Sequence, residues 1–169
     1  MAESFLTLMA EYCDEDQEKI SVWYDALQNA GFEGTQTKGL KHHISLCMFP
    51  LEMEKEAIEI TKQAAVDFSK FQVALRHGGV MPGGKVLFAA PDMCDELTAL
   101  QKACDQGKHI GLPFLPHTTM LIDDADTIGK ALPVLMEKFA PMPATIDRLH
   151  LCAFWPTRHI LTVELKGSK

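Results

Sequence analysis

Long apolar runs, a basic leader and paired cysteines are all missing from this sequence. No run approaches the roughly 20 apolar residues needed to cross a bilayer, so we expect no membrane partner. The first segment, MAESFLTLMAEYCDEDQ, has no basic residue before its apolar stretch, and Glu11 interrupts that stretch, so we expect no signal peptide. The five cysteines are an odd number, widely spaced and without a CxxC pair. Their distribution favours a reducing compartment over a disulfide framework, and we expect a cytoplasmic protein.

Basic residues are also scarce. Lysine and arginine total 16 against 23 aspartate and glutamate residues, which gives a formal net charge of −7. This balance argues against long duplex nucleic acid as a partner, because phosphate contacts need a basic surface. It leaves room for a small nucleotide, or a single RNA-end phosphate ester, in a local pocket. The 169 residues suffice for one good-sized domain or for two small lobes with a shared core.

Apolar periodicity divides the chain into two halves with the same order of elements: strand, helix, histidine-containing strand, helix, strand. In the first half we predict a strand at 5–12, a helix at 14–30, a strand within 39–50, a helix at 51–68 and a strand at 71–76. In the second half we predict a strand at 85–90, a helix at 91–105, a strand at 114–123, a helix at 124–138 and a hairpin of 146–154 with 159–165. The segment HGGVMPGG, residues 77–84, predicts a loop between the two halves.

Two adjacent histidines occur in the segment GLKHHISLCMFP, residues 39–50. Apolar side chains at even positions, the last of them Met48, alternate with His43, Ser45 and Cys47. Alternation with period two predicts a half-buried strand whose even positions face a core and whose odd positions face the other way. His43 is therefore the better candidate for chemistry, with the Ser45 hydroxyl beside it, and we expect His42 to pack or cap the strand entrance.

A second histidine occupies the matching place in the second half, in LPHTTMLI. His117 and Thr119 are again two residues apart, and we predict that Met120 and Ile122 face the opposite side of the strand. Each half thus offers one histidine and one hydroxyl on the non-core face of a strand. A single His-x-Ser/Thr match is common in proteins. The evidence for function is that both matches occur in strands at corresponding positions of the two halves.

The motif pair HISL (43–46) and HTTM (117–120) resembles the mark of the two-histidine (2H) phosphoesterase superfamily. That superfamily includes the bacterial 2′–5′ RNA ligase-like proteins and cyclic nucleotide phosphodiesterases. Pro116 matches the proline that usually precedes the family's second histidine, and KVLFAAPDMCDELTAL (85–100) is similar to its strand-to-helix segment with E-L-x-x-L. LIDDAD follows the second motif where RNA ligase-like members often carry a basic residue.

The resemblance implies one 2H phosphoesterase-like domain over residues 1–169. We expect an α+β fold that is bilobal and pseudo-symmetric, with two mainly antiparallel sheets forming a central cleft and helices on the outer faces. Lobe one would cover about 1–78 and lobe two about 84–169, with chain ends free to exchange between lobes. His43 and His117 would meet in the cleft.

The function implied is metal-independent hydrolysis of a 2′,3′-cyclic phosphate or a related nucleotide or RNA-end ester. Histidine suits both general acid and general base, because its ordinary pKa is close to neutral. His43 and His117 would serve as this pair, while Ser45 and Thr119 would bind the non-bridging phosphate oxygens. We expect no cofactor and no metal. The alternatives are 2′–5′ RNA ligation by the reverse reaction and a non-catalytic nucleotide-binding module.

Other residue groups favour less specific interpretations. A zinc site from His42, His43 and His117 is disfavoured, because adjacent strand residues point apart and no further ligand has suitable spacing. We expect Cys47 to be a small buried hydrophobe rather than a nucleophile. Three aromatic residues are open candidates for stacking on a nucleotide base or for packing in the core, namely Tyr12, Phe154 and Trp155.

Overall fold

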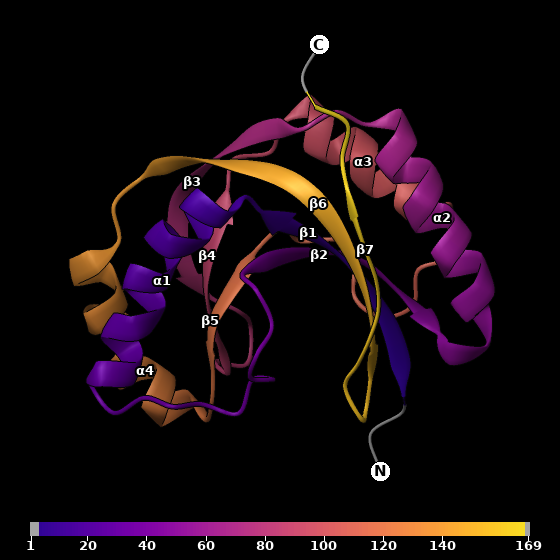
Figure 1. Ribbon diagram of the computed structural model, residues 1–169. Coiled ribbons are helices and arrows are strands. Elements are labelled where there is room, and N and C mark those ends of the chain that lie inside the picture. The colour runs from indigo at the N-terminus through magenta and orange to yellow at the C-terminus, as the bar shows by residue number, and fades with distance from the viewer. Residues whose placement is uncertain (1–3, 168–169) are drawn as a thin grey trace.

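A computed structural model describes residues 4–167, which form seven strands and four α-helices (Figure 1). The strands are β1 (Phe5–Tyr12), β2 (His43–Pro50), β3 (Phe71–Val80), β4 (Val86–Pro91), β5 (Thr118–Ile122), β6 (Met142–Phe154) and β7 (Arg158–Glu164). The helices are α1 (Asp14–Asn29), α2 (Glu54–Asp67), α3 (Asp95–Asp105) and α4 (Ala125–Lys138), and a short 3-10 helix, Leu51–Met53, precedes α2. The α+β class predicted from the sequence is confirmed.

All seven strands belong to one antiparallel sheet, in the order β2-β1-β6-β3-β4-β5 with β7 also paired to β6. The long strand β6 belongs to both halves of this sheet. Its residues 146–154 pair with β1, while on its other edge 142–146 pair with β3 and 148–153 pair with β7. The two sheets expected from the sequence are therefore joined through β6, which Figure 1 shows as an arch between the two sides of the molecule.

The helices form two pairs on the outside of the curved sheet (Figure 1). Helix α1 packs with α4 near β3, β4 and β5, and α2 packs with α3 near β2, β6 and β7. Each pair combines one helix from the first half of the chain with one from the second. The halves of the sequence therefore exchange whole helices, and not only their chain ends. The sequence predicts the loop between the halves at 77–84, and the structure has a turn at 81–85 that connects the paired strands β3 and β4.

The two faces of β1 show where the core and the cleft lie. Leu6, Leu8 and Ala10 are fully buried in the main core together with helix residues. Phe5 and Met9 point the other way and join a small apolar cluster on the concave face with Cys152 and Phe154. Because strand side chains alternate, every second residue of β1 and of residues 148–154 of β6 faces this concave side.

Strand β3 extends through residues 77–80, which the sequence predicts as loop. Gly78 and Gly79 pair with Ala89 and Phe88 of β4. A Cβ at Gly79 would lie 2.9 Å from the Phe88 ring. The glycines therefore allow close packing within the sheet rather than ending it, which is a common role of glycine in strands.

None of the helices in residues 4–167 is both long and apolar enough to cross a membrane.

Candidate active site

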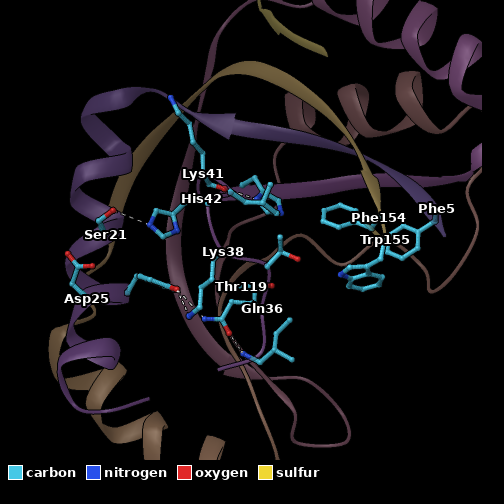
Figure 2. A pocket seen from close by; sticks show the side chains of 16 residues that line it. Phe5, Ser21, Asp25, Gln36, Lys38, Lys41, His42, Thr119, Phe154 and Trp155 are labelled. Atoms are coloured by element: carbon cyan, nitrogen blue, oxygen red, sulfur yellow. Dashed lines mark hydrogen bonds between the residues drawn. The ribbon is translucent and has the colours of Figure 1, made fainter. Parts of the chain in front are cut away.

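The two histidine motifs lie on the two edge strands of the sheet, β2 and β5. The curvature of the sheet brings these edges near each other. A cavity of about 470 Å³ opens between them. His43 from the first motif and Thr119 from the second line it, whereas Ser45 and His117 are not among its lining residues. Figure 2 shows this cavity, with Thr119 between His42 on one side and the aromatic residues Phe154 and Trp155 on the other.

His43 is held by a hydrogen bond within its own segment. Its Nδ1–H donates to the carbonyl oxygen of Lys41 at 2.7 Å. This bond fixes the tautomer, so the neutral ring keeps its lone pair on Nε2. Burial lowers the pKa of His43, and the charges of His150 and His117 act in the same direction. The Lys41 carbonyl and the Glu11 carboxylate oppose this shift by favouring the protonated form.

His117 is held in the same way. Its Nδ1–H donates to the carbonyl oxygen of Leu115, also at 2.7 Å and also two residues earlier. Burial lowers the pKa of His117, while the Leu115 carbonyl opposes the shift. The Phe88 ring meets the imidazole edge to face, with 5.7 Å between ring centroids. Both histidines therefore present Nε2 as the free nitrogen, in matching local geometry.

The hydroxyl residues of the two motifs are half-buried. Thr119 lines the cavity, and Ser45 lies on the concave side of β2, opposite Met9 of β1. The neighbouring Thr118 points into the core instead, where its hydroxyl bonds the Tyr12 hydroxyl at 2.7 Å. Tyr12 is fully buried, so it is unable to stack on a ligand, and the bond ties β1 to β5.

A β-bulge interrupts the alternation in each histidine strand. In β2, Ser45 pairs with Met9 and Cys47 with Leu8, so Leu46 has no direct partner. In β5, Thr119 pairs with Phe88 and Leu121 with Leu87, so Met120 has none. The extra residue in each strand is the fourth position of its motif.

These bulges overturn part of the predicted register. Beyond each bulge the faces exchange, because one inserted residue shifts a period-two pattern. Cys47, predicted on the His43 face, is buried in the core at 2 % exposure, and burial raises the pKa of its thiol. Met48, predicted in the core, is half-exposed, and Ile122, also predicted on the core side, lines the cavity. The interpretation of Cys47 as a small buried hydrophobe is confirmed.

His42 is fixed from α1. The Gln17 side-chain amide bonds both backbone groups of His42, each at 2.8 Å. The His42 ring lies 3.1 Å from the Ser21 hydroxyl and meets the Tyr24 ring edge to face. Burial lowers the pKa of His42 to about 4, so the ring is neutral at pH 7. These contacts fit the packing role predicted for His42, although its ring also lines the cavity.

One end of the cavity is aromatic. Phe5, Phe154 and Trp155 contact one another with ring centroids 5.5 to 5.6 Å apart, and all three line the cavity. Trp155 is 53 % exposed, whereas Phe154 is buried. The sequence predicts Phe154 and Trp155 as candidates for stacking but does not single out Phe5, because an apolar strand gives no sign that its first side chain faces a cavity.

A buried hydrogen bond between Glu11 and His150, next to His43, was also missed. Glu11 is 3 % exposed and His150 is 6 % exposed, and the Glu11 Oε1 lies 2.6 Å from His150 Nδ1. His150 Nε2 in turn lies 3.0 Å from Nδ1 of His159. The available signal was the charged residue inside the apolar strand FLTLMAEY, since buried carboxylates usually have a partner.

Comparison with known proteins agrees with the fold and the motifs. A sequence model of the 2′-5′ RNA ligase superfamily matches residues 17–154. The structure of E. coli LigT complexed with ATP is similar, with 17 % identity, coverage of 98 % of this chain and 99 % of that one, and a TM-score of 0.66. TT0787 of Thermus thermophilus is similar at 16 % identity, with coverage of 98 % and 100 % and a TM-score of 0.69. None of the curated proteins matches the chain by sequence.

The family match spans most of the chain and includes both histidine motifs, and the structural matches extend over nearly all of it. The resemblance drawn from HISL and HTTM is thereby confirmed, and the chain belongs to the 2′-5′ RNA ligase superfamily of two-histidine phosphoesterases.

Proposed function

We propose that this protein is a phosphoesterase that opens a 2′,3′-cyclic phosphate, or a related nucleotide or RNA-end ester, without a metal. His43 and His117 act as the general acid and base, and Ser45 and Thr119 bind the non-bridging oxygens. The proposal rests first on one observation. Each histidine donates from Nδ1 to the carbonyl two residues earlier, at 2.7 Å in both cases. Two free Nε2 atoms, on the facing edges of one sheet, are what an acid–base pair needs.

Hydrolysis of a cyclic phosphate requires two proton transfers on opposite sides of phosphorus. The neutral histidine takes a proton from water as the oxygen attacks, and the protonated histidine gives one to the departing ribose oxygen. Holding both rings on strands of a rigid sheet fixes the in-line geometry. Hydroxyl groups that donate to the equatorial oxygens stabilise the charge that develops there.

The cavity suits a nucleotide. Its aromatic end, Phe5 with Phe154 and Trp155, offers a surface on which a base stacks. Lys38 lines the same cavity and provides local positive charge despite the net charge of −7, whereas the Lys41 ammonium pairs with Asp14. Structures of E. coli LigT with ATP, 3′-AMP and NADP+ have the same fold as this chain. We place the activity in the cytoplasm, on the basis of the five unpaired cysteines.

Ligation of RNA ends is the second candidate, and the family match favours it. It uses the same two histidines to open the cyclic phosphate, with a ribose hydroxyl of the second RNA end as the nucleophile in place of water. The two reactions are told apart by supplying an RNA 5′-hydroxyl end together with the cyclic phosphate and analysing the products.

The test is an assay of 2′,3′-cyclic nucleotides in the presence of EDTA, with chromatographic detection of the nucleoside monophosphate. We expect turnover in EDTA by the wild type and by His77→Ala, whose imidazole is exposed and paired with Asp92 outside the cavity. Loss of activity that zinc or magnesium restores would contradict the mechanism. Tight nucleotide binding without turnover of any ester would indicate a binding module.

A further inference from the structure

A second cluster of chemically capable side chains lies on the concave face of the sheet, outside the His43–His117 pair. It consists of His150 and Cys152 on β6 and His159 on β7. One ligand atom from each lies within 4.8 Å of the other two. His150 and Cys152 are two residues apart in one strand, so both point to the same face. The Nδ1 atom of His159 lies 3.0 Å from Nε2 of His150.

A β-bulge brings the third member into place. Cys152 pairs with His159 and Leu151 with Leu161, so Ile160 is the unpaired extra residue of β7. Without this bulge Ile160 would lie opposite Cys152, and His159 would point to the other face of the sheet. Bulges commonly re-aim a side chain at functional sites.

The hydrogen bond that His150 donates to Glu11 orients His150 as a ligand. The carboxylate accepts from His150 Nδ1 at 2.6 Å, which leaves the Nε2 lone pair directed at the cluster. Metal-bound histidines almost always have such a carboxylate or carbonyl on the other nitrogen. The His150 and His159 rings are stacked, with centroids 5.0 Å apart and planes 13° from parallel.

We propose that His150, Cys152 and His159 bind one transition-metal ion, with Zn²⁺ the best match, and that Glu11 is the outer carboxylate that orients His150. Two imidazoles and one thiolate are the donors that zinc and similar borderline-soft ions prefer, whereas magnesium and calcium prefer oxygen. The charges of a divalent ion, the Cys152 thiolate and the Glu11 carboxylate sum to zero, which suits a buried position. His159 is exposed, so a fourth coordination position is accessible to water.

Metal binding releases one proton and moves another. The Cys152 thiol, which now donates to the Ala153 carbonyl at 3.6 Å, loses its proton to solvent as sulfur bonds the metal. His159 has to present the Nδ1 lone pair, so its proton moves to Nε2. No oxidant or reductant is involved.

The experiment is a titration of chelator-treated protein with Co²⁺, which reports thiolate coordination through a ligand-to-metal charge-transfer band. We expect a band that saturates at one Co²⁺ per chain and disappears when Zn²⁺ is added. Cys152→Ser and His159→Ala should abolish it, and Glu11→Gln should weaken binding roughly 10–100-fold, as outer-sphere changes do. Cys94→Ser and His77→Ala, which change residues outside the cluster, should leave it intact.

No band in the wild type, or a band that persists in Cys152→Ser, would overturn the proposal. Equal loss in Cys94→Ser would do the same. If circular dichroism shows that Cys152→Ser is misfolded, His159→Ala decides, because it removes only an exposed side chain. The readout involves no phosphate ester, so failure here leaves the proposed phosphoesterase function standing. Failure of the cyclic nucleotide assay likewise leaves the metal site untouched.

Discussion

His43 begins β2 and His117 directly precedes β5, at the two ends of the strand order, with the same hydrogen bonds around them but different charges. Each ring donates to the carbonyl two residues earlier, and each motif has a bulge at its fourth residue. The carboxylate of Glu11 raises the pKa of His43, whereas the shift of the pKa of His117 comes from burial, opposed by the Leu115 carbonyl. The shared hydrogen bonds and bulges orient both imidazole rings, and the different neighbouring charges give the two histidines different pKa values.

Removing either histidine should have the largest effect and tests whether the two motifs are equal partners. His43→Ala and His117→Ala should each lower turnover of a 2′,3′-cyclic nucleotide by roughly 10²–10⁴-fold, the usual scale for one general acid or base. The double variant should be little worse than either single one, because each group is of little use without the other. Steady-state kinetics with His77→Ala as control measures this. A large loss for one histidine alone would break the equivalence.

The adjacent threonines offer a matched pair on opposite faces of β5. Thr119→Val should lower turnover by up to about tenfold, the scale of one neutral hydrogen bond, with little effect on stability. Thr118→Val should instead lower the free energy of unfolding by about 1–3 kcal/mol, because it leaves the buried Tyr12 hydroxyl without its partner. Denaturant unfolding and kinetics on both variants separate the roles. The opposite assignment of effects would mean that Thr118, and not Thr119, faces the cavity.

His42 should affect acid stability more than turnover. Because its pKa falls from 6.5 in the unfolded chain to about 4 in the fold, its contribution is present above pH 6.5 and is lost as the pH falls towards 4. The wild type should therefore lose about 1–2 kcal/mol more than His42→Gln between pH 7 and pH 5. Urea unfolding of both proteins at the two pH values checks this. An equal loss in both would show that His42 is not the titrating group.

We expect the smallest effect from Glu11, the carboxylate that acts on His43 and distinguishes it from His117. Glu11 raises the pKa of His43, so Glu11→Gln should lower that pKa further and move one limb of the pH–rate profile to lower pH. The limb that belongs to His117 should stay in place. A shift of both limbs, or of neither, would remove the proposed difference between the histidines. Measurements in EDTA keep any metal bound at the neighbouring cluster from contributing.

Sequence patterns predicted most elements and both histidine segments, because period and capping are local properties of the chain. They missed the bulges at Leu46 and Met120, since the inserted residue is itself apolar and leaves the composition of the strand unchanged. For the same reason Cys47 was assigned to the wrong face. The exchange of helices between the halves and the pairing of Glu11 with His150 depend on contacts between distant residues, which periodicity does not encode.

The central claim is that two histidines, one neutral and one protonated, perform the reaction without a metal. The pH dependence of kcat/KM for a 2′,3′-cyclic nucleotide in EDTA tests it most directly. Because burial lowers the pKa of both His43 and His117 from 6.5, we predict a bell-shaped profile with its maximum below pH 6.5. Each histidine-to-alanine variant should lose one limb of the bell. A rate that rises steadily with pH and reaches a plateau, with no fall on the alkaline side, would contradict the account.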